Sequence, residues 1–221
     1  MQTIISYTYM SEILESVLNL VFPRQKETQT LEALTAQDLK ARLPEAISTE
    51  ENLVSLFDYR DKEVRQVVWE IKYRKNKQLA FMCAELLSEK LLDYLYEKRE
   101  FNPHAKFILL PVPISKKRRK HRGYNQTELV TDYISKMLPP ISYCKETLRR
   151  DIDKVSQTKK TKNERLENVK GCFSVLNPHH IRNNIVIIFD DVATTGATLT
   201  EICNQLSKHQ PKEVLRVTIA C

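Results

Sequence analysis

Apolar residues in this chain follow two different patterns, which alternate through its C-terminal half. Short unbroken apolar runs, such as Phe107–Leu110 and Ile185–Phe189, are typical of strands buried on both faces of a parallel sheet. In the segments between such runs, for example in 125–137, apolar residues recur every three or four positions, which is the spacing of one helical face. The alternation predicts an α/β fold with a mostly parallel sheet and helices on both faces.

The same patterns give approximate bounds for the elements. Strands are predicted over 53–59, 107–110, 142–148, 172–175, 185–189 and 214–220, and helices over 62–73, 76–97, 125–137 and 197–208. The basic run Lys116–Arg122 is expected in the loop between a strand and a helix. Residues 149–170 are highly charged, and their later part is predicted to be helical.

The N-terminal residues do not continue this alternation. Ser11–Phe22 has the apolar spacing of an amphipathic helix that ends at Pro23. Leu31–Leu43 is predicted to be a second, mostly exposed helix that Pro44 stops. We therefore expect a small helical segment over 1–52, appended to one domain over 53–221.

The composition narrows the class of protein. The chain has 221 residues and a net charge of +7, which suits an anionic ligand or partner, although a solvated basic face is a common cause of such an excess. Its five cysteines are scattered, so we expect reduced thiols in a cytoplasmic protein. No apolar run has the length of a membrane span, and the N-terminus lacks the pattern of a secretory signal.

The most informative stretch follows the predicted strand Ile185–Phe189. Asp190 and Asp191 come at its carboxyl edge, where ligands bind in open α/β sheets. A short run rich in small and hydroxyl residues, 193–198, then leads into a helix whose free N–H groups and dipole attract an anion. The two acids could accept hydrogen bonds from vicinal hydroxyls, so the stretch predicts a ribose 5-phosphate site. A plain strand, cap and helix would not require two acids and three threonines in this order.

The basic run Lys116–Arg122 leaves several interpretations open. It is consistent with a solvated surface, with a nucleic-acid contact, or with donors for a second anion such as pyrophosphate, because it lies at a predicted sheet edge. Tyr124 could stack on a base, although a tyrosine at a helix start is more often part of the core. The candidate nucleic-acid contacts are Lys116, Lys117, Arg118, Arg119, Lys120, Lys159, Lys160 and Lys162.

The order of short motifs resembles one family. The sequence contains PVP at 111–113, RGYNQ at 122–126, LRR at 148–150, QT followed by RLEN within 157–168, and DDVATTGAT at 190–198. FDY at 57–59 and IKY at 71–73 also fit. This order resembles the ComF family of competence-associated, type I phosphoribosyltransferase-like proteins over about 53–221.

The resemblance implies a type I phosphoribosyltransferase fold that binds phosphoribosyl pyrophosphate (PRPP) or another ribose 5-phosphate ligand with Mg²⁺. It implies catalytic roles for Asp190, Asp191 and Arg122, with Mg²⁺ held through the two aspartates and 149–168 acting as a mobile hood. It also suggests that Pro111–Ser115 is the pyrophosphate loop, in which a cis peptide is common. The implied PRPP-binding residues are Val112, Pro113, Arg122, Asn125, Gln126, Gln157, Arg165, Asn168, Asp190, Asp191, Ala193, Thr194, Thr195, Gly196, Ala197 and Thr198.

One departure from the family concerns zinc. ComF proteins commonly carry a four-cysteine zinc module after a helix that ends in Phe-Pro. Val21–Arg24 fits that approach, but no cysteine precedes Cys83, so we predict no zinc.

Two functions remain open from the sequence. One is pentosyl transfer from PRPP to an unidentified acceptor, linked to DNA uptake or nucleotide metabolism. The other is a non-catalytic module that binds single-stranded DNA or competence and recombination proteins.

Overall fold

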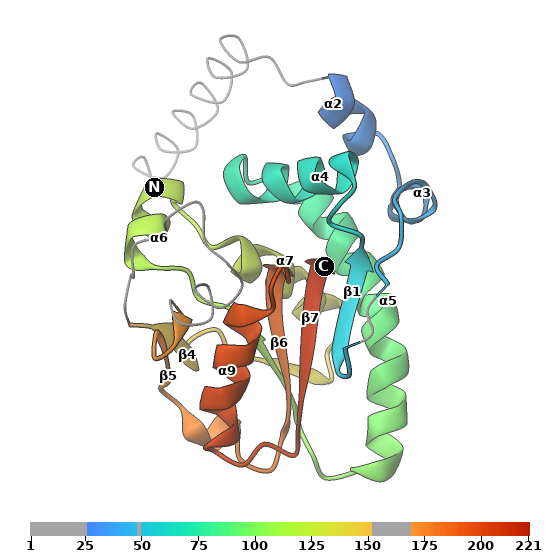
Figure 1. The fold of residues 1–221 in the computed structure, drawn as a ribbon. Coiled ribbons are helices and arrows are strands. Elements are labelled where there is room, and N and C mark those ends of the chain that lie inside the picture. Colours follow the sequence, from blue (N-terminus) through green and yellow to red (C-terminus); the bar gives the residue numbers. More distant parts are fainter. Residues whose placement is uncertain (1–25, 48–49, 152–168) are drawn as a thin grey trace, which may run out of the picture.

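The computed structural model describes residues 26–47, 50–151 and 169–221, and Figure 1 shows how their elements are arranged. The α-helices are α2 (Lys26–Glu32), α3 (Ala36–Arg42), α4 (Lys62–Tyr73), α5 (Lys77–Phe101), α6 (Lys116–Arg122), α7 (Gln126–Met137) and α9 (Ala197–Ser207). The strands are β1 (Leu53–Phe57), β2 (Phe107–Pro111), β3 (Ile141–Tyr143), β4 (Leu148–Arg150), β5 (Phe173–Val175), β6 (Ile185–Val192) and β7 (Glu213–Ala220), and Pro178–His180 forms a 3₁₀ turn. The helix predicted over Ser11–Phe22 lies outside the described residues.

Five strands form one parallel sheet in the order β1-β7-β6-β2-β3. The long apolar run of β6 lies at its centre, where Ile187 is in register with Leu109 of β2 and with Leu215 of β7. All five residues of Ile185–Phe189 are buried, as expected for a strand covered on both faces. The predicted α/β class with a mostly parallel sheet is confirmed.

The two faces of the sheet carry two separate hydrophobic clusters. Successive strand residues point to opposite faces, so Ile187 joins the cluster under α4, α5 and α7, while Ile188 joins the cluster under α9. Figure 1 shows α9 on one side of the sheet and α5 and α7 on the other. Helices therefore cover both faces, as predicted.

Capping residues set the starts of several helices. Asp61 accepts hydrogen bonds from the N–H groups of Glu63 and Val64 at the start of α4, and Asn76 accepts from Leu79 N–H at the start of α5. None of the helices in the described ranges is long and apolar enough to cross a membrane.

Three predicted elements differ from the structure. The basic run Lys116–Arg122 is the helix α6 and not a loop, because Ser115 caps its start and Gly123 ends it with a φ of 77°. The run consists of basic residues and histidine, so it has no apolar spacing that would indicate a helix, and none of its side chains is buried.

The strand predicted over 142–148 is wrong in its middle part. β3 ends at Tyr143, and β4 pairs antiparallel with β5 in a separate two-stranded sheet. Thr147, between them, is fully buried, and its hydroxyl lies 2.7 Å from Nδ1 of His180. Its carbonyl also accepts a hydrogen bond from the N–H of Leu176. These contacts divide what the apolar pattern suggested was one strand.

The prediction of one mostly exposed helix over Leu31–Leu43 is also wrong. The chain forms α2 and α3, separated by a turn before the cap residue Thr35. Leu31, Leu39 and Leu43 are buried in the cluster under α4 and α5. Although this segment has few apolar residues, α2 and α3 direct their leucines toward α4 and α5, so the segment packs against the core and is not mostly exposed.

Candidate functional site

A pocket of about 320 Å³ lies over the carboxyl ends of β2 and β6. These neighbouring strands continue in opposite directions across the sheet, β2 through α6 and α7 to β3, and β6 through α9 to β7. Such a switch point leaves a crevice, because the two connecting helices cover opposite faces. The topology thus explains why the pocket forms where the acid pair ends β6.

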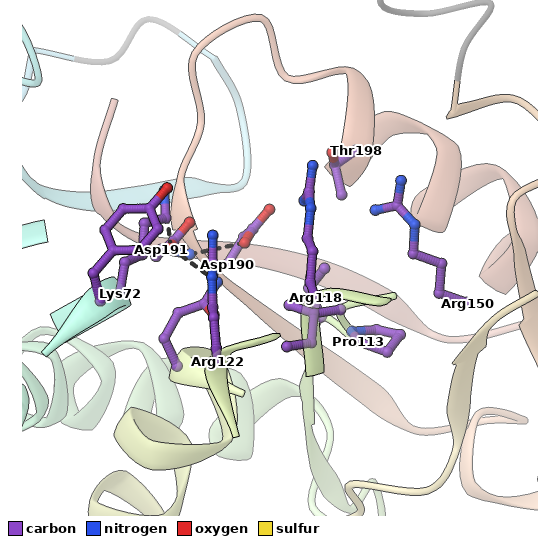
Figure 2. A pocket seen from close by; sticks show the side chains of 12 residues that line it. Lys72, Pro113, Arg118, Arg122, Arg150, Asp190, Asp191 and Thr198 are labelled. Atoms are coloured by element: carbon purple, nitrogen blue, oxygen red, sulfur yellow. Dashed lines mark hydrogen bonds and ion pairs between the residues drawn. The ribbon is translucent and has the colours of Figure 1, made fainter. Parts of the chain in front are cut away.

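The two adjacent aspartates have different surroundings. Asp191 is only 5% exposed, and its Oδ2 lies 3.0 Å from Nζ of Lys72 on α4. The same oxygen accepts a 3.0 Å hydrogen bond from Nε2 of Gln126 on α7. Asp191 is therefore tied to the helices on one face of the sheet, as the dashed lines in Figure 2 show.

Asp190 lines the pocket without an ion pair of this kind among the described residues. Its Oδ1 accepts a 2.9 Å hydrogen bond from the backbone N–H of Asp191. Burial, reinforced by the charge of Asp191, raises the pKa of Asp190 well above its usual range, although Lys72 opposes the shift. A cation or a hydrogen-bond donor arriving at Asp190 would stabilise its charged form.

The loop after β6 forms an anion cradle beside Asp190. Gly196, with a φ of 67°, is the cap residue of α9, and no side chain caps that helix. The N–H groups of its first turn have no intrahelical partner, as at any helix start, and Gly196 offers them no capping side chain. A small hollow of about 30 Å³ follows the loop and is lined by Asp190 and by Val192, Ala193, Thr194, Thr195, Gly196, Ala197, Thr198 and Leu199.

Three arginines face the same pocket from different elements. Arg118 and Arg122 come from α6, and Arg150 comes from β4. Figure 2 shows Arg118 and Arg150 on the Thr198 side of the pocket, with Lys72 and Asp191 on the other side. With Lys72, the lining has four cations and two carboxylates, so its charge favours an anion.

Arg122 also takes part in a relay of polar contacts. Its Nη1 donates a 2.9 Å hydrogen bond to Oε1 of Gln126, whose Nε2 in turn donates to Asp191. The guanidinium lies 4.7 Å from the ring centroid of Tyr73. The relay fixes the orientation of Arg122 relative to the acid pair.

The loop 111–115 lies beside the acid pair, as the sequence suggested, and Val112, Pro113 and Ile114 line the pocket. The N–H of Val112 donates to the carbonyl of Phe189, which binds the loop to β6. The Val112 carbonyl accepts from Nδ2 of Asn125 and from the hydroxyl of Thr127. The expected cis peptide is not present, since every peptide bond in the described residues is trans.

The predicted site residues fall into three groups. Seven of them line the larger pocket, namely Val112, Pro113, Arg122, Gln126, Asp190, Asp191 and Thr198, and the rest of the 193–198 loop lines the small hollow. Asn125 is buried, and its side chain caps α7 and holds Val112. Gln157, Arg165, Asn168, Lys159, Lys160 and Lys162 lie outside the described residues.

The candidate nucleic-acid residues of α6 are all exposed, and among them Arg118 also reaches the pocket. Arg119 forms an ion pair with Glu128. Lys116, Lys117 and Lys120 lie on the outer surface of the helix.

Sequence reasoning missed three residues of the pocket as site residues. Lys72 and Tyr73 come from the end of α4, and Arg150 comes from β4. The only signals in the sequence were the IKY and LRR motifs at these positions, and these motifs did not assign a role in ligand binding to any of the three residues. No periodicity shows that α4 would bring its last turn to the end of β6.

Comparisons with known proteins support a phosphoribosyltransferase-type domain in this part of the chain. The family model described as "Phosphoribosyl transferase domain" matches residues 127–221. The chain is 26% identical over 166 residues to the "DNA utilization protein YhgH" of Escherichia coli strain K12, covering 72% of this chain and 67% of that protein.

Two competence proteins are also similar. The chain is 28% identical over 145 residues to "Competence protein ComFC" of Bacillus subtilis, which covers 66% of this chain and 53% of the relative. It is 32% identical over 107 residues to "Competence protein F" of Haemophilus influenzae, covering 48% of this chain and 46% of the relative. The chain thus spans about half the length of these two competence proteins.

One solved structure, titled as the allosteric regulatory enzyme of purine biosynthesis, matches with a TM-score of 0.37 and 15% identity, covering 68% of this chain and 30% of the other.

The parallel sheet, the acid pair at its edge and the matching family model define a phosphoribosyltransferase-type domain. Within that class, the three bacterial relatives confirm the resemblance to the ComF family that the motifs carry. The predicted absence of a zinc module stays a prediction, since much of the relevant segment lies outside the described residues.

Proposed function

We propose that the pocket binds PRPP, or another ribose 5-phosphate ligand, together with Mg²⁺. The observation that carries the proposal is the juxtaposition of a half-buried carboxylate, Asp190, with the anion cradle at 193–198. The cradle would take the 5′-phosphate through backbone N–H groups and threonine hydroxyls. Asp190 would accept hydrogen bonds from ribose hydroxyls.

The structure suggests a division of roles within the acid pair. Because Oδ2 of Asp191 already accepts from Lys72 and Gln126, we infer that Asp191 mainly holds Lys72 and α7 in place. Asp190 would then be the principal ligand of the ribose. This modifies the expectation from the family resemblance, in which both acids hold ribose hydroxyls.

The donor set fits a magnesium ion. Mg²⁺ is commonly held by one or two carboxylates together with substrate phosphates. No group of three or more metal-ligating side chains occurs in the part of the chain that the structure describes, so most of the ligands would come from PRPP and water. Bound Mg²⁺ would offset the charge of the pyrophosphate, and Asp190 would gain a cationic neighbour.

The pocket supports pentosyl transfer as the reaction. The bond between C1′ and the pyrophosphate oxygen would break, a bond from C1′ to an acceptor nucleophile would form, and the proton of the acceptor would pass to solvent. Arg118 and Arg122 would stabilise the charge that develops on the departing pyrophosphate. Catalysis would then rest on positioning and electrostatics. We expect this reaction in the cytoplasm, linked to DNA uptake or nucleotide metabolism, because the relatives are named for competence and DNA utilization.

Calorimetric titration of PRPP with Mg²⁺ tests the proposal. Asp190→Asn should weaken binding about tenfold or more, because hydrogen bonds to a charged group are worth about 1.5–3 kcal/mol. Asp93→Asn, which removes an exposed carboxylate from α5, is the matched control and should bind as the wild type does. Equal affinities of the wild type and Asp190→Asn would refute the ribose assignment, and pyrophosphate release would separately report turnover.

A second candidate function is nucleic-acid binding. It is favoured by the exposed cations of α6, which lie beside the pocket. We call this surface the basic ridge, and it consists of Lys116, Lys117, Arg118, Arg119 and Lys120. Replacement of Lys116, Lys117 and Lys120 by alanine should then reduce both DNA affinity and its dependence on salt. Unchanged DNA binding in this variant would make α6 a solvated surface.

A further inference from the structure

The exposed stripe of α4 has an unusual composition. Its members are Lys62, Arg65, Trp69 and Tyr73, spaced three or four residues apart, so they share one face of the helix. Trp69 and Tyr73 are 42% and 52% exposed. No exposed acid interrupts this stripe of cations and large aromatic rings.

The acids of α4 are directed elsewhere. Glu63 forms an ion pair with Arg42 of α3. Glu70 is buried and accepts hydrogen bonds from Thr28 and Gln66, and its Oε1 also lies 3.9 Å from Nε of Arg74, so it stays beneath the exposed surface. The outer face of α4 is therefore both aromatic and positive, a combination that suits a ligand with flat rings and negative charge.

The rings and cations on this face are in contact with one another. The centroids of Trp69 and Tyr73 lie 5.6 Å apart, with the ring planes inclined at 42°. The guanidinium of Arg74 lies 5.5 Å from the Trp69 ring centroid, and that of Arg122 lies 4.7 Å from the Tyr73 centroid. We call Trp69, Tyr73 and Arg74 the α4 platform.

The α4 platform continues directly into the basic ridge of α6. Tyr124 joins the two helices, since its hydroxyl donates to the carbonyl of Ile71 and accepts from the N–H of Lys75. Arg122 belongs to α6 and contacts Tyr73. Rings that can stack on bases thus lie next to cations that can follow a phosphate backbone.

Two strongly exposed aromatic residues of α5 lack this setting. Tyr96 and Phe101 of α5 are 68% and 75% exposed, yet in the described ranges no cation lies over either ring. Isolated exposed rings of that kind are common on protein surfaces. Phe81 of α5, which is 43% exposed, does pair with Tyr133, and Lys136 lies 5.9 Å from the Tyr133 centroid, but neither ring lines the pocket. The α4 rings differ because Tyr73 lines the pocket.

We propose that the α4 platform is a base-stacking site for single-stranded nucleic acid, whose phosphates extend along α6. This deepens the second candidate function by assigning its base-reading residues, and it does not depend on PRPP binding. Tyr73 and Arg122 also line the ribose pocket, so a bound strand would cross its mouth. The ribose site and the strand would then influence each other through Arg122.

The primary test is fluorescence anisotropy of a labelled oligothymidylate with the full chain. Trp69→Ala should weaken binding about tenfold, in keeping with the cost of removing one base–aromatic stack. Trp69→Phe should retain most of the affinity, which shows that the ring matters and not the folding of α4. Tyr96→Ala is the matched control and should bind like the wild type.

An abasic strand of the same length separates stacking from charge. Because it keeps the phosphates and lacks bases, Trp69→Ala should bind it as well as the wild type does. Wild-type affinity of Trp69→Ala for oligothymidylate would overturn the proposal, and so would an equal loss on the abasic strand or an equal loss on a DNA duplex.

Tryptophan fluorescence gives an independent reading, since Trp69 is the only tryptophan of the chain. Saturation with oligothymidylate should quench it, and an unchanged spectrum at saturation would contradict stacking on this ring. PRPP titrated separately into the wild type reports the ribose site, so failure of that site and failure of the α4 platform are distinguished.

Discussion

At the scale of single residues, the acid pair shows how one sequence step separates two roles. Successive residues at the end of β6 point to opposite sides of the sheet. Both carboxylates line the pocket, but Asp191 meets Lys72 and Gln126, whereas Asp190 also lines the small hollow of the 193–198 loop. The sequence presents two equal carboxylates, and the neighbours supplied by α4 and α7 make them unequal.

This difference predicts a pH-dependent effect of Asp190→Asn on stability. Burial and the Asp191 charge raise the pKa of Asp190 to about 7, against an ordinary value of 3.8 in the unfolded chain. The folded state therefore binds the proton more tightly, and the wild type loses stability as pH rises from about 4 through 7. Asparagine does not titrate, so thermal melting should show a larger gain in Tm for the variant at pH 8 than at pH 5. The Asp93→Asn control should show no such change with pH, and an identical shift for Asp190→Asn at both pH values would contradict the burial argument.

At the scale of elements, α7 connects the pocket loop to the sheet. Its cap residue Asn125 accepts from the N–H of Thr127 and donates to the carbonyl of Val112. Thr127 adds a second hydrogen bond to the same carbonyl. The start of α7 thus fixes loop 111–115 against the end of β6.

We expect Asn125→Ala to destabilise the protein by about 1–2 kcal/mol, because it removes a helix cap and a buried hydrogen bond. Urea denaturation measures this change. PRPP affinity should also fall, since Val112 and Pro113 lose an anchor while the charge of the pocket is unchanged. Asn204→Ala, at an exposed position of α9, is the control. A variant with unchanged stability would show that Asn125 is not needed to hold the loop.

At the scale of the whole molecule, residues 26–47 share the core of the domain. Leu31, Leu39 and Leu43 pack in the cluster that also contains α4, α5 and the inner face of the sheet. The chain then returns along β1, where Glu45 forms an isolated bridge with Phe57. In the described residues, α2 and α3 therefore complete the cover of α4 and α5.

Leu39→Ala tests this shared core. Leu39 is fully buried, and truncation at such a site costs about 2–5 kcal/mol. The single unfolding transition of the whole domain should shift in urea, as measured by circular dichroism. Leu92→Ala, at a 40% exposed position of α5, should change stability by less than about 1 kcal/mol. If α2 and α3 formed an independent unit, the main transition would stay in place.

The sequence by itself determined the elements whose patterns are strong. The stripe of Lys62–Tyr73 gave α4 at its observed bounds, and the run Ile185–Phe189 gave the start of β6, which continues through the acid pair to Val192. Burial on two faces and burial on one face leave different periodicities. The sequence also marked the acid pair and the loop 193–198 as a candidate site, because these residues are adjacent in the chain, and both line the pockets described above.

Only the tertiary structure decided which distant residues join that chemistry. Lys72, Tyr73 and Arg150 reach the pocket because α4 and β4 end beside β6, and no local pattern encodes this neighbourhood. The helix α6 and the burial of α2 and α3 were hidden for a related reason. The helix α6 depends on the cap residue Ser115, and the packing of α2 and α3 depends on leucines whose contacts lie far away in the sequence. Local patterns reveal what a segment can become, whereas contacts between distant segments decide what each residue does.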